Sequence, residues 1–260
     1  MLDLSSVRRI VVKVGSSTLT HEGGRLNFRR IDSLVRVLSD LENSGKQVVL
    51  VSSGAQAAGV AKLGLGKKPA DLPGRQAVAA VGQCEIMHIY DKAFEEYGQK
   101  VAQILLTRDV IDVPSRLQNV HNTFETLFSM GALPIVNEND SVAVDELVIG
   151  ENDSLSAMVA CICGADLLII LSDIEGLYDK DPRRFPDARL IPVVEKITDE
   201  IRASAGGAGS DRGTGGMATK IHAAELCHES NIPMLILNGE DPALLYDVFE
   251  GKPAGTLFLP

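Results

Sequence analysis

The stretch "IVVKVGSS", residues 10–17, decides the fold class. Its first five residues are apolar except for Lys13, and a short turn of one glycine and two serines follows at once. A continuous apolar run, rather than an alternating one, is typical of a parallel strand that helices cover on both faces. We therefore predict a buried strand over residues 10–14 that ends in a turn at Gly15.

Further apolar runs of the same kind predict five more strands of this sheet. They are "QVVLV" (47–51), "VAQILL" (101–106), "LPIV" (133–136), "LLIIL" (167–171) and "PMLIL" (233–237). Apolar residues at helical spacing lie between them over 28–41, 120–128 and 155–162, ahead of Gly45, Gly131 and Gly164. This alternation predicts an α/β fold, a three-layer αβα sandwich with a mainly parallel central sheet.

Length and composition favour one compact globular protein. The chain has 260 residues, 45% of them hydrophobic, and we expect a single domain over residues 1–260. Its net charge of −10 argues against a nucleic-acid-binding protein, which usually presents a basic surface. No apolar run resembles a signal peptide or a membrane span, so we expect a soluble cytoplasmic protein that binds no membrane.

The four cysteines predict neither a disulfide framework nor a zinc site. Cys161 and Cys163 lie in an apolar stretch with no second pair of ligands nearby, and the others are Cys84 and Cys227. We expect all four to be reduced and buried as packing residues.

Small and polar residues follow several of the predicted strands. They are "SSGA" (52–55), "NEND" (137–140) and "SD" (172–173), in addition to "GSS" after the first strand. Open α/β sheets bind ligands beyond the carboxyl ends of their strands. The sequence therefore predicts a ligand site at that edge of the sheet.

The glycine-rich segment "GTGGMATK" (213–220) could bind phosphate in several ways. A P-loop is excluded, because no strand precedes the segment and the lysine follows a threonine. A dinucleotide fingerprint matches Gly213, Gly215 and Ala218, with Glu240 further on, but it also lacks the preceding strand. A helix that begins near Gly216 would point free N–H groups at an anion, with Lys220 in its first turn. A flexible surface loop with a solvated lysine remains an alternative.

Lys13 interrupts its apolar strand near the carboxyl end. A buried ammonium is costly unless it is paired, although the side chain could also extend to solvent. Two lysines, each beside a glycine turn, suggest a site that holds a transferring phosphoryl group from two sides. Such transfer depends mainly on positioning and charge neutralisation.

Eight stretches in order resemble the amino acid kinase family, over essentially the whole chain. They are "KVGSSTL" (13–19), "VSSGAQAAG" (51–59), "LLTRDV" (105–110), "PIVNENDSVA" (134–143), "GENDSLSA" (150–157), "LSDIEGLYDKDPR" (171–183), "GTGGMATK" (213–220) and "GTLF" (255–258). Acetylglutamate kinase and aspartokinase carry two glycines after the first lysine, whereas Ser16 takes the second place here. That departure resembles the branch of the family that phosphorylates glutamate.

The resemblance implies ATP-dependent phosphorylation of the side-chain carboxylate of L-glutamate, which yields L-glutamyl 5-phosphate in the first step of proline biosynthesis. It implies that Lys13 and Lys220 stabilise the phosphoryl group and that Asp153 orients both lysines. The implied glutamate ligands are Ser53, Gly54, Asn137, Asp140 and Asn152. The implied nucleotide ligands are Gly15, Ser16, Ser172, Asp173, Thr214, Gly215, Gly216, Met217, Ala218, Thr219 and Lys220. Magnesium should arrive with ATP, and we assign it no protein ligand.

Structural alternatives exist for the three acidic residues. Asp153 could cap a helix that begins at Ser154, Asp140 could be a turn aspartate, and Asp173 could simply face water at a strand end. The expected nucleophile is a carboxylate with a pKa of about 4.3, already ionised at neutral pH, so no histidine is needed as a general base. Alternative functions are a non-catalytic sensor of nucleotide or amino acid, and a sister kinase acting on aspartate or acetylglutamate.

Many members of the family carry a C-terminal PUA domain. The chain stops at Pro260 just after "GTLF", so we expect no PUA domain. The resemblance also implies feedback inhibition by proline and a homodimer or homotetramer, for which the stretch 73–97 could supply an interface or could equally be core.

Overall fold

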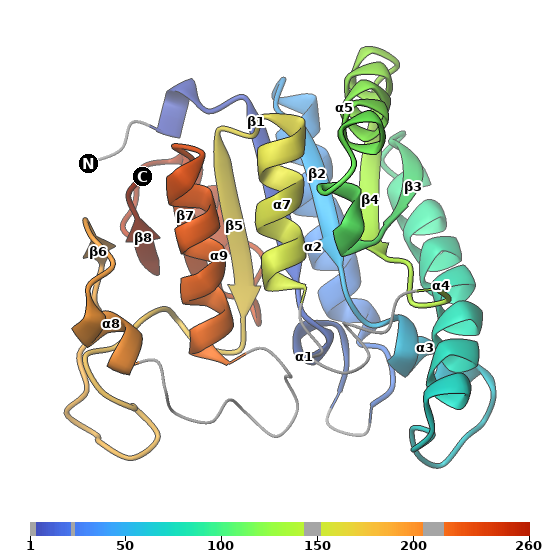
Figure 1. Ribbon diagram of the computed structural model, residues 1–260, viewed down its shortest axis with the longest axis horizontal. Helices are drawn as coiled ribbons and strands as arrows, with labels where there is room; N and C mark the ends of the chain where they lie inside the picture. Colours follow the sequence, from blue (N-terminus) through green and yellow to red (C-terminus); the bar gives the residue numbers. More distant parts are fainter. Residues whose placement is uncertain (1–3, 22–23, 143–151, 205–215) are drawn as a thin grey trace.

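The computed structural model describes residues 4–21, 24–142, 152–204 and 216–260. An eight-stranded sheet forms the middle layer, in the order β3-β4-β2-β1-β5-β7-β8-β6, and helices cover both of its faces (Figure 1). The predicted three-layer α/β fold with a mainly parallel sheet is confirmed.

All six predicted strands are present and pair in parallel. Their bounds are β1 Arg9–Val14, β2 Gln47–Ser52, β3 Lys100–Leu106, β4 Ala132–Glu138, β5 Leu167–Ser172 and β7 Met234–Asn238. β1 lies between β2 and β5, where Lys13 is paired with Val51 on one side and Ile170 on the other. The strand quoted first is therefore near the middle of the sheet, and its end is surrounded by other strand ends.

The predicted helices are also present, and the structure adds several more. Helix bounds are α1 Ser16–Leu19, α2 Phe28–Asn43, α3 Ala55–Lys62, α4 Leu72–Glu95, α5 Pro114–Ser129, α7 Asp153–Cys163, α8 Asp199–Ser204, α9 Met217–Glu229 and α10 Leu244–Phe249, with short 3-10 helices at Leu4–Ser6 and Arg108–Val110. Across the ranges that the structure describes, no helix has the length and apolarity to cross a membrane.

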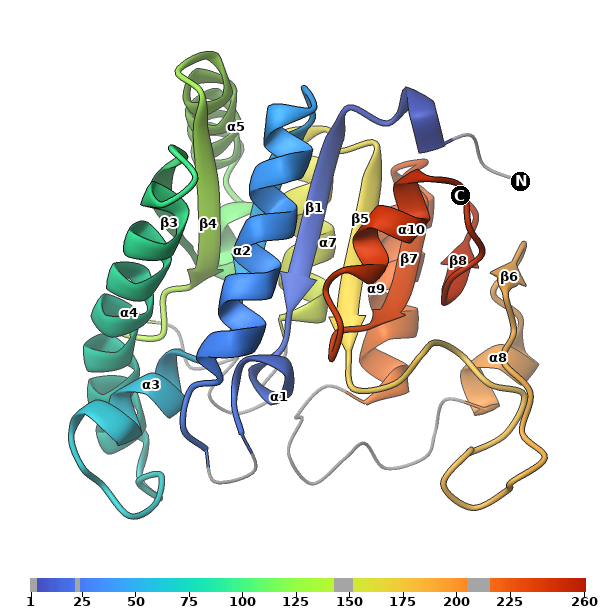
Figure 2. The ribbon, with the colours of Figure 1, turned by 180° about the vertical axis from the view of Figure 1, so that it is seen from behind.

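The two faces of the sheet are covered by different helices. α5, α7 and α9 pack on one face (Figure 1), and α2, α4 and α10 pack on the other (Figure 2). Side chains alternate along β1, so Ile10 and Val12 join the core under α2, while Val11 joins the core under α7 and α9. Lys13 has the same parity as Val11 and therefore points toward α7 and α9.

Two strands at one end of the sheet were not predicted. β8 Thr256–Phe258 runs antiparallel to β7, and β6 Val193–Val194 pairs in parallel with β8. Stretches of two or three residues are too short for an apolar run to show. They complete the sheet away from the predicted site.

The prediction that all four cysteines are buried is wrong for Cys84 and incomplete for Cys161. Cys163 and Cys227 are buried, Cys161 is half-buried, and Cys84 is exposed; all four are free thiols. Cys84 lies on the exposed side of α4, whereas Gly82 and Ile86 of the same helix are buried.

Candidate active site

Two lysines from distant parts of the chain meet on one carboxylate. The Nζ atom of Lys13 lies 2.6 Å from Oδ1 of Asp153, and the Nζ atom of Lys220 lies 3.1 Å from Oδ2 of the same residue. The three residues come from β1, α7 and α9. Asp153 is fully buried, and both lysines are more than nine-tenths buried. The alternatives of a lysine reaching solvent and of a solvated loop lysine are therefore wrong.

The start of α7 directs Asp153 into this group. α7 begins at Asp153, its N-cap residue is Asn152, and neither side chain serves as a cap. The capping alternative for Asp153 is therefore wrong. A carboxylate in the first turn is also favoured by the helix dipole, which helps to keep it ionised.

Thr219 joins the same group from the first turn of α9. Its hydroxyl oxygen lies 2.8 Å from Oδ2 of Asp153 and 2.7 Å from the carbonyl oxygen of Gly216. Gly216 is the N-cap of α9 and offers no side-chain cap to the N–H groups of the first turn. We call Lys13, Asp153, Thr219 and Lys220 the charged cluster.

Electrostatics keeps the carboxyl group of Asp153 ionised. Burial by itself would raise the pKa of Asp153, but the charges of Lys13 and Lys220 lower that pKa far below its usual value. Burial lowers the pKa of Lys220, and the attraction of Asp153 opposes that change. Two ammonium groups thus share one carboxylate, and this small buried group has an excess of positive charge that suits an anion.

A second group of side chains lies beside the first and is neutral. The Nδ2 atom of Asn152 donates to Oγ of Ser53 at 2.9 Å and to Oδ1 of Asn137 at 3.0 Å. The Nδ2 atom of Asn137 in turn donates to Oε1 of Gln83 at 2.9 Å. We call Gln83, Asn137, Asn152 and Ser53 the amide chain. Gln83, on α4, was not predicted, because the apolar pattern of 73–97 gave no reason to single it out.

The buried acceptor atoms of this region that have no hydrogen-bond partner among the described residues include Oδ1 of Asn152 and Oδ1 of Asp140, which follows β4. Burial raises the pKa of Asp140 to about 6, against the opposing charge of Lys68. Unpaired buried acceptors are costly, so both atoms suit a ligand that brings a donor, above all an ammonium group.

The backbone conformation explains one of the two predicted glycines, Gly54, but not the other, Gly15. Gly54 has φ +99°, a left-handed conformation that favours glycine, so the turn into α3 explains it. Gly15 has φ −84°, which any residue adopts, and a Cβ there would lie 3.6 Å from Nζ of Lys13 in ordinary contact. Nothing in the described protein demands glycine at residue 15.

The remaining predicted nucleotide ligands in the described part of the chain lie at the carboxyl end of β5 and at the starts of α1 and α9. Ser172 is buried and its hydroxyl donates to Asp173 at 3.3 Å, while Asp173 is exposed and forms an ion pair with Arg183 at 3.5 Å. Ser16 is the first residue of α1, and Met217 and Ala218 are the first two of α9. Thr214 and Gly215 lie outside the described residues.

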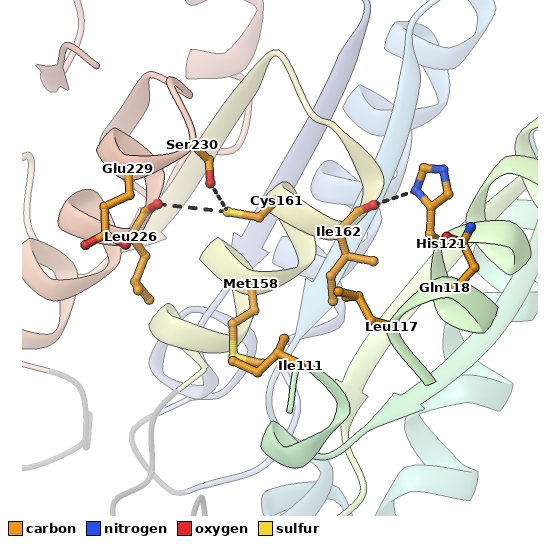
Figure 3. A pocket seen from close by; sticks show the side chains of 10 residues that line it. All are labelled: Ile111, Leu117, Gln118, His121, Met158, Cys161, Ile162, Leu226, Glu229 and Ser230. Carbon is orange, nitrogen blue, oxygen red and sulfur yellow. Dashed lines mark hydrogen bonds between the residues drawn. The ribbon is translucent and has the colours of Figure 1, made fainter. Parts of the chain in front are cut away.

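A separate cavity of about 510 Å³ opens on the outer face of α5, α7 and α9 (Figure 3). Most of its lining is apolar, including Met158, Ile162 and Leu226, and the Sγ atom of Cys161 lies 3.1 Å from Oγ of Ser230 at its wall. None of the predicted site residues lines this cavity. The predicted site at the strand ends is therefore distinct from it.

Two buried ammonium groups near the strand ends of an α/β sheet fit a protein that transfers phosphoryl groups, because such transfer depends on charge neutralisation. The chain belongs to the amino acid kinase family, whose sequence pattern matches residues 8–238. Solved structures agree on the fold: UMP kinase from Ureaplasma parvum matches with a TM-score of 0.66 at 15% identity, covering 98% of this chain and 99% of that one. An isopentenyl phosphate kinase from T. acidophilum matches with a TM-score of 0.60 at 18% identity, covering 96% and 99%.

Two relatives with much higher sequence identity are both glutamate 5-kinases. Glutamate 5-kinase of Clostridium perfringens is 54% identical, covering 98% of this chain and 97% of its own length. Glutamate 5-kinase of Listeria monocytogenes is 53% identical, covering 98% of this chain and 94% of its own length.

Proposed function

We propose that this protein transfers the γ-phosphoryl group of ATP to the side-chain carboxylate of L-glutamate, giving L-glutamyl 5-phosphate in the first step of proline biosynthesis. The structural observation that carries this proposal is the meeting of Lys13 and Lys220 on Asp153 at the strand ends. The glutamate 5-kinases that match nearly the whole chain at over half identity support the choice of substrate.

The charged cluster supplies what the reaction needs most. The carboxylate of glutamate is already ionised at neutral pH and attacks without a general base. Negative charge on the phosphoryl group must be neutralised as it moves, and two ammonium groups fixed in advance do this without reorganisation. Asp153 is a positioning residue, because it holds Lys13 and Lys220 on either side of the group in flight.

The nucleotide is expected to lie between the turn after β1 and the start of α9. The Lys13 ammonium, which lies close to Gly15, and the uncapped N–H groups in the first turn of α9 both suit phosphate oxygens. Magnesium would arrive on the phosphates, since Mg²⁺ usually keeps several waters and binds through phosphates plus one or two carboxylates. Asp153 is unsuited as a ligand because both of its oxygens already contact ammonium groups.

The amide chain and Asp140 are expected to bind the amino-acid end of glutamate. Its α-ammonium group would supply donors to the unpaired oxygens of Asn152 and Asp140. That arrangement would point the side-chain carboxylate toward the charged cluster. It would favour an α-amino acid over a simple dicarboxylate, because only the former satisfies both acceptors.

The experiment is an ADP-release assay with L-glutamate, L-aspartate and N-acetyl-L-glutamate as separate substrates. We expect L-glutamate to have the highest kcat/KM, and hydroxylamine to trap the acyl phosphate product as a hydroxamate. A preference for aspartate or acetylglutamate would assign the protein to a sister kinase. Binding of ATP and glutamate without turnover would make it a sensor.

We further propose that the protein works in the cytoplasm as a homodimer or homotetramer, that residues 1–260 act as one domain, and that proline inhibits it. Light scattering at micromolar concentration checks the oligomer, and a monomer would contradict it. Initial rates at low glutamate with millimolar proline check the inhibition. Unchanged rates would contradict that part of the proposal.

A further inference from the structure

We infer that Gln83 is a positioning residue that fixes the orientation of the Asn137 and Asn152 amides and so determines which polar atom is offered to the substrate. The inference rests on the proposed function, because it concerns recognition of the glutamate ammonium group. Gln83 lies at the end of the amide chain, and its role follows from the direction in which that chain donates.

Every hydrogen bond in the amide chain runs the same way. Asn152 donates to Asn137, to Ser53 and, at 3.4 Å, to the backbone carbonyl oxygen of Ser52, and Asn137 donates to Gln83. An amide group has a donor end and an acceptor end, so each donation fixes which way the next amide faces. The acceptor that ends the chain is Oε1 of Gln83. At the other end, Oδ1 of Asn152 remains buried and without a partner among the described residues.

Losing the acceptor at residue 83 would leave the NH₂ group of Asn137 without its partner, while Ser53 and the carbonyl oxygen of Ser52 would still accept from Asn152. The Asn137 amide could then rotate and present its NH₂ group to the NH₂ group of Asn152, an arrangement with two donors and no acceptor. That repulsion would act on the Asn152 amide against its hydrogen bonds to Ser53 and Ser52, and it would displace the acceptor oxygen that faces the substrate. Binding of an ammonium group would weaken, while the charged cluster would be untouched.

The contact between α3 and α4 holds Gln83 in place. A Cβ on Gly82 would lie 1.6 Å from the carbonyl oxygen of Ala55, and one on Gly59 would lie 1.9 Å from that of Val78. The two helix backbones therefore touch at glycines on both sides of the contact. Residue 83 follows Gly82 directly, and Ala55 begins α3 just after Ser53 and Gly54. Gln83 and Ser53 are thus fixed by one rigid helix pair, while Asn152 is held at the start of α7.

The test compares Gln83→Met, which keeps the size but removes the acceptor, with Gln83→Glu, which keeps an acceptor oxygen at the same place. Gln118→Met is the matched control, because Gln118 is another helical glutamine bonded to an asparagine, Asn122, on α5. We expect Gln83→Met to raise KM for L-glutamate about tenfold and to leave kcat and KM for ATP within about twofold. Gln83→Glu should stay within about threefold of the parent.

Glutarate, which lacks the ammonium group, separates positioning from general damage. We expect its inhibition constant against L-glutamate to change less than about twofold in Gln83→Met. An unchanged KM for glutamate in that variant, or equal weakening of glutamate and glutarate, would overturn the inference.

Hydrogen exchange of the Asn137 and Asn152 side-chain amides, measured by NMR without ligand, keeps the inference testable if the parent does not phosphorylate glutamate. Such a failure would remove the proposed function alone. Slow exchange in the parent and in Gln83→Glu, with at least about tenfold faster exchange in Gln83→Met, supports the role of Gln83. Equal exchange in all three proteins would refute it.

Discussion

Asn152 and Asp153 are neighbours in the chain, yet they belong to two groups of opposite character. Asp153 is the centre of the charged cluster, where both carboxylate oxygens contact ammonium groups. Asn152 belongs to the amide chain, where the donors are used and one acceptor oxygen has no partner among the described residues. The start of α7 thus separates a group with an excess of positive charge, which suits an anion, from a neutral group that lacks a hydrogen-bond donor.

This difference predicts different consequences for the two groups. Charges that are buried and paired stabilise the fold and wait in position for the phosphoryl group, so damage there should reduce stability and kcat. An acceptor without a partner gains its hydrogen bond only when substrate arrives, so damage there should act on KM or kcat/KM for glutamate. The predictions below run from the largest expected effect to the smallest.

Replacing the shared carboxylate should have the largest effect. Asp153→Asn leaves two buried ammonium groups without their counter-charge, and we expect the free energy of unfolding to fall by about 3–5 kcal/mol, with loss of activity. Urea denaturation measures the change. Asp199→Asn, which breaks an exposed ion pair with Arg202 on α8, is the control and should leave unfolding nearly unchanged. A loss below about 1 kcal/mol for Asp153→Asn would show that the pairing does not matter to folding.

Removing one ammonium should slow the chemistry. We expect Lys220→Ala to lower kcat by roughly a hundredfold or more, since a fixed charge contact to a transition state is worth about 3 kcal/mol. KM for glutamate should stay within about threefold, because the amide chain is intact. Lys252→Ala, at an exposed lysine paired with Asp247, is the control for steady-state kinetics. A kcat within threefold of the parent would contradict the role of Lys220.

The pH dependence should report on Asp140. Its pKa is raised to about 6, so it is ionised above that pH and neutral below it. Only the ionised form attracts an ammonium group, so kcat/KM for glutamate should fall about tenfold between pH 7 and pH 5. The Asp140→Asn variant shares the titration of ATP and is the control. If parent and variant lose kcat/KM in parallel, the inflection does not belong to Asp140.

Removing one hydroxyl from the amide chain should have the smallest effect. Ser53→Ala deletes one of the acceptors for Asn152 and leaves Asn137 in place. We expect KM for glutamate to rise about fivefold, the equivalent of about 1 kcal/mol, with kcat within twofold. Ser44→Ala, whose hydroxyl caps only the end of α2, should behave as the parent does. A fall in kcat larger than the rise in KM would mean that the two groups are not separate.

The sequence predicted the strands and helices of the fold better than it predicted the separation between the charged cluster and the amide chain. The six predicted strands left a continuous apolar signal, and five of them are buried along nearly their whole length. β3, at the edge of the sheet, is partly exposed, so the expectation that it is buried on both faces was wrong. β6 and β8 span two or three residues and left no such signal. The lysine in β1 was detectable because a charge inside an apolar run needs a partner. Its partner was not determined by local pattern, because Asp153 begins a helix, where an aspartate is equally suited to capping.

The amide chain was harder to predict because it depends on tertiary contacts. Ser53, Asn137 and Asn152 were identified through resemblance and through their positions after strands, but Gln83 lies within a long helix whose sequence gives no sign of its direction. Its proximity to Asn137 arises from the contact of α3 with α4 at Gly59 and Gly82, which only the fold reveals.

The most direct test of the central claim is a crystal structure with ADP, magnesium, aluminium fluoride and L-glutamate bound together. The account predicts that Nζ of Lys13 and Nζ of Lys220 both contact the fluoride-bearing group, that Asp153 still bridges them, and that the glutamate ammonium group lies against the oxygens of Asn152 and Asp140. A fluoride group contacted by only one of the lysines, or glutamate bound away from the amide chain, would contradict it.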